Sequence, residues 1–219
     1  MKRTIENALQ YSDGAHESVL NQLLGTQFTA TPRSSLVLAY IAIELEHQRA
    51  ISTLVRAGLT GSGLALMRVQ LEAALRGMWV NLIASDIQVD GISKRGDEPF
   101  PKFRVLVKQL DDAYGAQGWL ESFVDQWTTL NGYTHSGLEQ LGMRFQADGN
   151  IAPNYPDGVI SDLLTLSGTV TIGTTVPLFR SFGFPEKAEA LEKWLDDNRQ
   201  KTSEDADAGG ETVKQFSSG

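Results

Sequence analysis

Hydrophobic positions are densest between Ser62 and Asp86, where they recur at the i+3/i+4 spacing of an α-helix. One stripe consists of Leu64, Met67, Leu71, Leu75, Met78 and Leu82. Further apolar residues cover most of the remaining helix surface. A helix that is apolar almost all the way round must be surrounded by other helices. We therefore predict that this segment is the central helix of a bundle.

Three charged residues, Arg68, Glu72 and Arg76, interrupt this apolar segment. On a helical wheel Arg68 and Glu72 fall among positions that point to the predicted core, namely Leu64, Leu75, Trp79 and Ile83. A structural ion pair is the ordinary interpretation of such an i, i+4 pair. Burying an ion pair is costly in desolvation and is often no more stable than apolar packing. That cost makes a functional role for Arg68 and Glu72 worth testing.

The rest of the chain shows helical patterns separated by turn signals. Thr31-Pro32 predicts a helix start, Gly58 a helix end, and Ser62 the N-cap of the central helix. Two antiparallel neighbours therefore span 32–57 and 62–86. We predict further helices at 3–25, 101–114, 118–145 and 185–200, with polar loops at 87–101 and 148–156.

The segment 161–182 is ambiguous, because its run of Thr, Val, Ile and Gly favours a strand. No partner strand is evident elsewhere, and an isolated strand would leave its backbone unpaired. We interpret this segment as a buried helix. The prediction is an all-α, up-and-down bundle of six or seven helices over residues 1–200, followed by a disordered acidic tail at 201–219.

Composition narrows the function classes. The 219 residues are 41% hydrophobic and 21% charged, as in a soluble globular protein. The net charge is −8, and nine acidic against five basic residues from Glu186 onward supply half of the excess. This excludes the broad basic surface of a dedicated nucleic-acid binder, although a local basic patch is predicted at Lys94, Arg95, Lys102, Arg104 and Lys108.

The chain has no cysteine, which excludes disulfides and thiolate chemistry and fits a reducing compartment. No signal segment is evident, and the longest apolar run is too short to span a bilayer. We expect a cytoplasmic protein without membrane contact. The sequence contains no phosphate-binding loop, dinucleotide fingerprint or nucleophile elbow.

His135 is the strongest candidate for chemistry. Asn131 lies four residues before it and Glu139 four residues after it, so all three would line one face of a continuous helix. A histidine oriented by an amide or an acid is typical of general acid–base catalysis. The alternative is an interhelical hydrogen bond with a structural role only.

The other two histidines have simpler interpretations. His16 lies among polar neighbours and is interpreted as a solvated surface residue. Glu44 and His47 share the Glu-x-x-His spacing of di-iron bundles, but such sites need a second motif that the chain lacks. We interpret His47 as a core histidine, and we expect neither a metal nor a cofactor.

The chain resembles the HEPN-like helical proteins of bacteria over roughly residues 36–145. The resemblance rests on three runs: His47 to Leu59, Leu66-Met67-Arg68-Val69-Gln70-Leu71-Glu72-Ala73, and Tyr133-Thr134-His135. It implies an all-helical homodimer that is an RNA-cleaving toxin or a phage-defence effector. Nucleases of that family carry an arginine four to six residues before the histidine, whereas residues 127–134 contain none. Arg68 would then have to supply the positive charge.

Two functions follow. In the first, a HEPN-like protein acts on RNA or a nucleotide, with Asn131 orienting His135 and with Glu72 holding Arg68 against a phosphate. An antitoxin or another protein would be its partner. In the second, the protein is a non-catalytic module that binds a ligand or partner, and a buried polar network of Arg68, Glu72 and His135 fixes the helix register.

Overall fold

The computed structural model describes residues 4–95, 100–114, 120, 122–146 and 148–211, and it confirms the all-α prediction. Nine helices lie within these residues: α1 (Ile5–Leu23), α2 (Pro32–Arg56), α3 (Thr60–Leu82), α4 (Asp86–Arg95), α5 (Phe103–Tyr114), α6 (Ser122–Thr134), α7 (Leu138–Gly142), α8 (Asp157–Ser181) and α9 (Pro185–Glu211). The only β pairing in the described part is an isolated bridge between Phe145 and Ile151.

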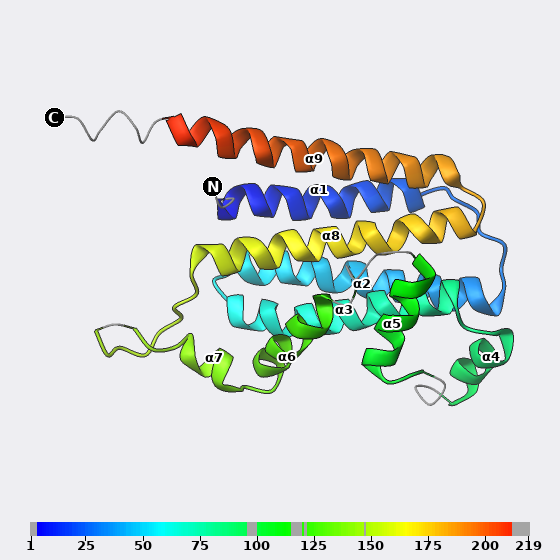
Figure 1. The fold of residues 1–219 in the computed structure, drawn as a ribbon, viewed down its shortest axis with the longest axis horizontal. Coiled ribbons are helices and arrows are strands. Elements are labelled where there is room, and N and C mark those ends of the chain that lie inside the picture. Colours follow the sequence, from blue (N-terminus) through cyan, green and yellow to red (C-terminus); the bar gives the residue numbers. More distant parts are fainter. Residues whose placement is uncertain (1–3, 96–99, 115–119, 121, 147, 212–219) are drawn as a thin grey trace.

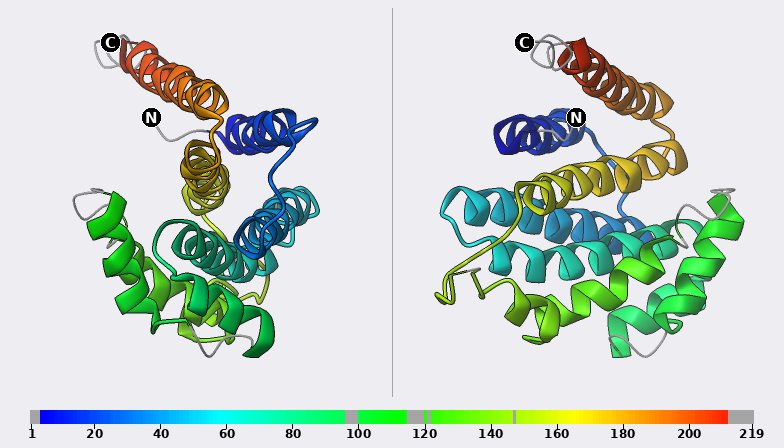
Figure 2. Two further views of the ribbon diagram at one scale, coloured as in Figure 1. Left: turned by 90° about the vertical axis from the view of Figure 1, so that its right-hand side faces the viewer. Right: turned by 60° about the vertical axis from the view of Figure 1, so that its left-hand side comes forward.

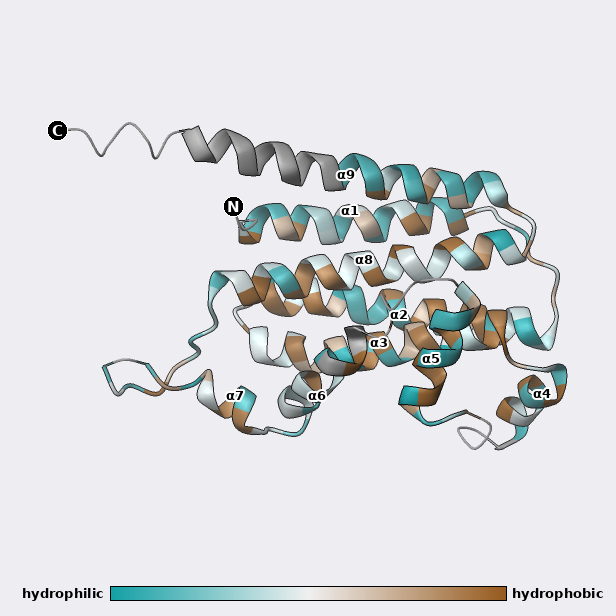
Figure 3. Cartoon of the chain, viewed as in Figure 1, coloured by the Kyte–Doolittle hydropathy of each residue, from teal (hydrophilic) through white to brown (hydrophobic). Residues whose placement is uncertain are grey.

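Helix α3 is the centre of the bundle, as its sequence predicts. It packs against α2, α5, α6 and α8. Helices α8, α1 and α9 lie on one side of the α2–α3 pair, and the short helices α4 to α7 lie on the other (Figures 1 and 2). Figure 3 shows hydrophobic residues concentrated in α3 and α8, whereas the described part of α9 is largely hydrophilic.

The α2–α3 hairpin is confirmed, and both of its ends are fixed by specific contacts. The Thr31 hydroxyl accepts the Ser34 amide at 3.1 Å and completes a capping box at the start of α2. Gly77 lets the two helices approach closely, because a Cβ there would lie 2.9 Å from the Cβ of Tyr40. At the far end of α3, the Arg33 guanidinium donates to the carbonyls of Val80 and Ala84.

The start of α3 differs from the prediction. Ser62 is not its N-cap: the helix begins at Thr60, the cap position is Leu59, and no side chain caps the first turn. Ser62 instead lies within the first turn, where its amide donates to the Leu59 carbonyl at 3.0 Å.

Helix α8 confirms the helical interpretation of 161–182 despite its β-favouring composition. Several of its hydroxyls donate to the carbonyl four residues earlier, as Thr175 does to Thr171 at 2.7 Å. Gly168 permits close contact with α1, since a Cβ there would lie 3.2 Å from the Cβ of Ala15. The helix is buried against α1, α2, α3 and α9, and tertiary contacts therefore override its strand propensity.

By length and composition alone, α8 is also the one described helix that could cross a membrane. However, 61% of its most apolar window is buried inside the bundle. Such burial is typical of the core helix of a soluble protein.

Three other boundaries correct the sequence-based expectations. The predicted loop at 87–101 contains a helix, α4, anchored by an Arg33–Asp86 ion pair of 2.9 Å. The predicted helix at 118–145 is interrupted after Thr134, where Ser136 has a left-handed φ of 54°. The last helix runs to Glu211 rather than ending near residue 200, and the tail from 212 to 219 lies outside the described residues.

Candidate functional site

Helix α3 carries a polar side chain, Gln70, in the buried core. The Gln70 amide donates to the Ser167 carbonyl at 2.9 Å and to the Thr171 hydroxyl at 3.0 Å. In return, the Ser167 hydroxyl donates to the Gln70 amide oxygen at 2.6 Å. Gln70, Ser167 and Thr171 are all fully buried. These bonds tie α3 to α8 without any group left for a ligand.

Glu44 of α2 extends this buried polar region. The Thr174 hydroxyl lies 2.9 and 2.8 Å from the two Glu44 oxygens. Complete burial raises the pKa of the Glu44 carboxyl to about 8, against the opposing effect of hydrogen bonds from Thr174 and Thr171. The side chain is therefore mostly neutral at pH 7. A neutral acid of this kind agrees with the lack of an ion pair between Glu44 and any described residue.

The charged residues of α3 form a row on a different face. Glu72 lies between two arginines, 2.7 Å from Arg76 and 3.7 Å from Arg68. The side chains are 23% (Arg68), 30% (Glu72) and 23% (Arg76) exposed. The sequence places Arg68 and Glu72 toward the core, and the structure places them at its edge, where solvent reaches them.

Aromatic side chains from α5, from α6 and from the segment just before α5 contact this row. The Arg68 guanidinium carbon lies 4.6 Å from the centre of the Trp127 ring, and Trp127 stacks on Phe103 with ring centres 3.7 Å apart. Arg76 is placed similarly, 4.8 Å from the Phe100 ring centre. Cation–π contacts of this kind fix a guanidinium without neutralising its charge. The Nε of Arg68 is buried and has no hydrogen-bond acceptor among the described residues.

His135 and Asn131 share a stripe of α6 with Trp127, because the three residues are spaced by four. The end of α6 touches α3, where the Thr134 hydroxyl lies 3.4 Å from the Ala65 carbonyl. His135 is exposed, and no hydrogen bond or ion pair joins its side chain to another described residue. The structure therefore brings Arg68, Glu72 and Trp127 together, whereas no hydrogen bond or ion pair among the described residues joins Asn131 or His135 to Arg68 or Glu72.

Glu139 does not lie on this stripe, and the prediction that it shares a helix face with His135 is wrong. The helix ends at Thr134, and Glu139 belongs to α7. Its carboxylate folds back against Gly132, where any Cβ would overlap it. The glycine thus accommodates the turn that separates Glu139 from the histidine.

An apolar groove of about 460 Å³ runs along the neighbouring side of α6, between α3 and α8. Its walls include Leu64, Met67, Leu130, Tyr133 and Leu163. A volume of this size falls within the range of small-molecule sites. Lys102, just before α5, and Arg104, in its first turn, are exposed cations.

The remaining histidines differ from each other in their surroundings. His16 is half-buried rather than solvated, and its Nδ1 lies 3.3 Å from the Gln48 amide oxygen. His47 is partly buried, and no hydrogen bond joins it to Glu44 in the described part of the chain. Across those same residues, no group of three His, Asp or Glu side chains is arranged to hold a metal ion.

A model for a family of unknown function, DUF6988, matches residues 41–196. The chain belongs to this family. The DUF6988 match covers the whole of α3 and α6, including Arg68, Glu72 and His135, and begins within α2, so that α1 lies outside it. No curated protein and no solved structure matches the chain.

The sequence pattern identified Arg68 and His135 as candidate site residues. It did not identify Trp127, which contacts Arg68, or Phe103, which stacks on Trp127. Trp127 belongs to the same i, i+4, i+8 series as Asn131 and His135, and that spacing was the available signal. The contact of Phe103 with Trp127 joins segments separated by residues 115–119, so no local pattern could reveal it. Arg76 was recognised only as a break in the apolar pattern.

Proposed function

We propose that the protein is a HEPN-like effector that acts on RNA at the face formed by α3 and α6. The observation that carries the proposal is the state of Arg68. Its guanidinium is fixed over Trp127 of α6, lies 3.7 Å from Glu72, and remains partly exposed; His135 directly follows the last residue of α6. A pre-oriented arginine of this kind is suited to a phosphate.

His135 would act as a general acid or base in strand cleavage. In that step the ribose 2′-hydroxyl attacks the adjacent phosphorus, and the bond from phosphorus to the 5′-oxygen breaks. His135 either accepts the proton of the 2′-hydroxyl or donates a proton to the departing 5′-oxygen, and water makes the other of these two proton transfers. The products are a 2′,3′-cyclic phosphate and a free 5′-hydroxyl, so atoms and charge balance without a cofactor.

The spacing along α6 assigns separate tasks to Arg68 and His135. Trp127 and His135 are eight residues apart, which corresponds to about 12 Å along a helix. Arg68, which contacts Trp127, would therefore hold a phosphate beside the reacting one, and Asn131 would lie between them. The exposed Lys102 and Arg104 at the start of α5 would extend the backbone contact, while the apolar groove offers space for an unstacked base.

The same proposal includes the biological role that the HEPN resemblance implies. The protein would be a toxin or a phage-defence effector in the cytoplasm. It would form a homodimer, and an antitoxin or a similar protein partner would restrain it. The DUF6988 match leaves all of these features open to experiment.

Cleavage by purified protein tests the proposal directly. Wild type, His135→Ala and Ser35→Ala would be incubated with total RNA and a labelled single-stranded oligonucleotide. Ser35 is the control because it is exposed on α2, outside the face formed by α3 and α6. We expect cleavage by wild type and Ser35→Ala and none by His135→Ala, with cyclic phosphate at the new ends. Equal cleavage by His135→Ala, or intact RNA in all three reactions, overturns the nuclease.

A second function is favoured by one specific observation, the 460 Å³ apolar groove beside α6. A non-catalytic module would use this groove to bind a ligand or a partner helix. In this case RNA would stay intact with every variant, and Val159→Asp, at a partly buried position of the groove wall, would abolish ligand or partner binding. The polar network that fixes register would then be the one around Gln70 rather than the row of Arg68.

A further inference from the structure

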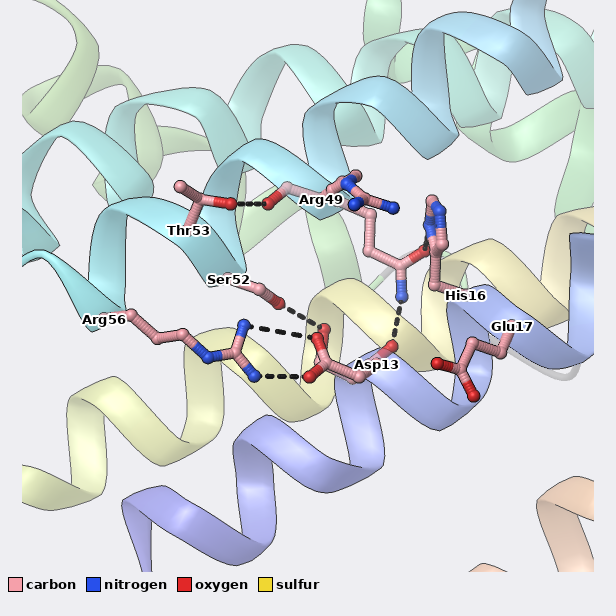
Figure 4. Close-up of a pocket in the computed structure, with 9 residues that line it drawn as sticks. Asp13, His16, Glu17, Arg49, Ser52, Thr53 and Arg56 are labelled. Carbon is pink, nitrogen blue, oxygen red and sulfur yellow. Dashed lines mark hydrogen bonds and ion pairs between the residues drawn. The ribbon is translucent and has the colours of Figure 1, made fainter.

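The contact between α1 and α2 contains a polar cleft on the opposite side of α2 from the α3–α6 face. Its volume is about 220 Å³ (Figure 4). The floor consists of buried polar groups, Ser12, Gln48 and Ser52. The walls carry charged side chains from both helices. A space between helices is normally filled by apolar side chains, so a polar one that stays unfilled is a candidate for ligand binding.

Hydrogen bonds on the floor fix the orientation of each group. The Gln48 amide nitrogen donates to the Ser12 carbonyl at 2.8 Å, which turns its oxygen toward His16. His16 must therefore carry its proton on Nδ1, leaving Nε2 as an acceptor. Burial, together with the charge of Arg49, lowers the pKa of the imidazole, so His16 is neutral at pH 7. The Ser52 hydroxyl donates to Ser12, whose own hydroxyl proton remains available.

The two walls of the cleft carry equal numbers of cationic and anionic side chains. Arg56 of α2 pairs with Asp13 of α1, and this ion pair closes one end of the cleft. Arg49 and Glu17 remain, and neither forms an ion pair with a described residue. Figure 4 shows that Arg49 comes from α2 and Glu17 from α1, on opposite walls. A simple anion would face Glu17 and a simple cation would face Arg49, whereas a molecule with both charges would satisfy the two walls.

We infer that this cleft binds a small zwitterion, of which a free amino acid is the simplest form. Arg49 receives the carboxylate, because a guanidinium matches two carboxylate oxygens. Glu17 receives the ammonium group, which can also donate to Nε2 of the neutral His16. The Ser12 hydroxyl supplies a further donor to the carboxylate. The cleft is separate from the proposed RNA-binding face, and the inference does not depend on the proposed function.

The test is a ligand screen on the purified full-length protein. Each of the twenty amino acids is added singly at millimolar concentration, the Tm is recorded, and any stabilising compound is then titrated by calorimetry. Each hit is compared with two analogues, one lacking the ammonium group and one lacking the carboxylate. We expect one or a few amino acids to raise the Tm and both analogues to bind about tenfold more weakly or worse.

Substitutions then locate the site. Arg49→Gln and Glu17→Gln each remove one charged partner at an exposed position and should weaken binding about tenfold. Arg104→Gln and Glu46→Gln, which are exposed charges outside the cleft, should bind as wild type. The inference is overturned if no amino acid binds, if the analogue without an ammonium group binds equally well, or if Arg49→Gln and Glu17→Gln bind like wild type.

Discussion

Two polar regions on helix α3 differ in how completely their hydrogen bonds are satisfied. Gln70 lies in the core, and both ends of its amide are bonded to α8. Arg68 lies only two positions away along the chain, but its guanidinium meets an aromatic ring and a carboxylate 3.7 Å distant. Its Nε has no acceptor among the described residues. Helix α3 thus carries a polar group whose hydrogen bonds are all satisfied on one face, and a guanidinium whose hydrogen bonds are not all satisfied on another.

The difference indicates which polar groups serve the fold and which remain for a ligand. A buried group without its hydrogen-bond partner costs about 1–3 kcal/mol, so a network with a structural role is expected to be complete. The Gln70 network is complete in this sense. The row of Arg68, Glu72 and Arg76 is partly exposed, and the buried Nε of Arg68 has no acceptor among the described residues, so this row is not complete in the same sense.

The largest effect is expected from Gln70→Ala. The substitution leaves the Ser167 hydroxyl without its acceptor and opens a cavity in the core. We expect the free energy of unfolding to fall by about 3 kcal/mol, measured by urea denaturation. Gln70→Leu should lie between the alanine variant and wild type, because it fills the space but restores no hydrogen bond.

Gln126→Ala is the matched control for this experiment, since Gln126 is an exposed glutamine of α6. It should change stability by no more than about 0.5 kcal/mol. If Gln70→Ala lowers the free energy of unfolding by less than about 1 kcal/mol, the buried hydrogen bonds of Gln70 do not stabilise the fold. The contrast drawn between Gln70 and Arg68 would then be wrong.

The next effect concerns pH and Glu44. Because the folded pKa is about 8 and the unfolded value about 4.5, the folded protein holds a proton that the unfolded chain loses between these values. The contribution of Glu44 to stability is therefore fully present below pH 4.5 and is lost as the pH rises through 8. Its slope is at most about 1.4 kcal/mol per pH unit.

Glu44→Gln isolates this effect, because glutamine keeps the shape and cannot ionise. We expect the variant to gain stability relative to wild type as the pH rises from 5 to 9, in urea titrations at each pH. The difference between the two proteins cancels all other titrating groups. A constant difference across this range would mean that Glu44 is ionised in the folded state.

Sequence patterns were sufficient for the architecture but not for the surroundings of the site. The i+3/i+4 stripe of α3 predicted its central place, and the missing partner strand correctly indicated that 161–182 is helical. Both inferences rest on periodicity and on the need to pair the backbone, which act locally. The polar core was not foreseen, because the bonds from Gln70 and Glu44 to α8 span roughly a hundred residues or more of chain.

The failures at helix ends have two origins. Ser62 is a good capping residue by type, yet α3 starts earlier because the turn after Gly58 is short. Helix α4 was missed although its start carries a local signal, a capping box in which the Ser85 amide donates to the Gln88 side-chain oxygen and the Gln88 amide donates to the Ser85 hydroxyl. For the candidate site, Arg68, Glu72 and His135 could be named from the sequence. Their distances and the contact of Arg68 with Trp127 depend on how α6 packs, which no local signal specifies.

A smaller effect is expected from Arg68→Gln. The change removes the cation–π contact and a half-exposed ion pair, so the free energy of unfolding should fall by only about 1 kcal/mol. If Arg68 contacts a phosphate, the variant should bind RNA about tenfold more weakly. The plot of log affinity against log salt concentration should also become less steep by about one unit, because one phosphate contact is lost. Filter binding at several salt concentrations measures both, and an unchanged slope would remove Arg68 from the interface.

The smallest effect on stability is expected from His135→Ala. The imidazole is exposed and bonded to no described residue, so the free energy of unfolding should stay within about 0.5 kcal/mol of wild type. Urea denaturation beside the Ser35→Ala control measures the difference. A loss above about 1 kcal/mol would mean that His135 belongs with the closed, structural network of Gln70. If His135→Ala keeps its stability but loses cleavage, His135 belongs instead with Arg68 on the exposed face. Its imidazole would then contribute to the reaction and not to the fold.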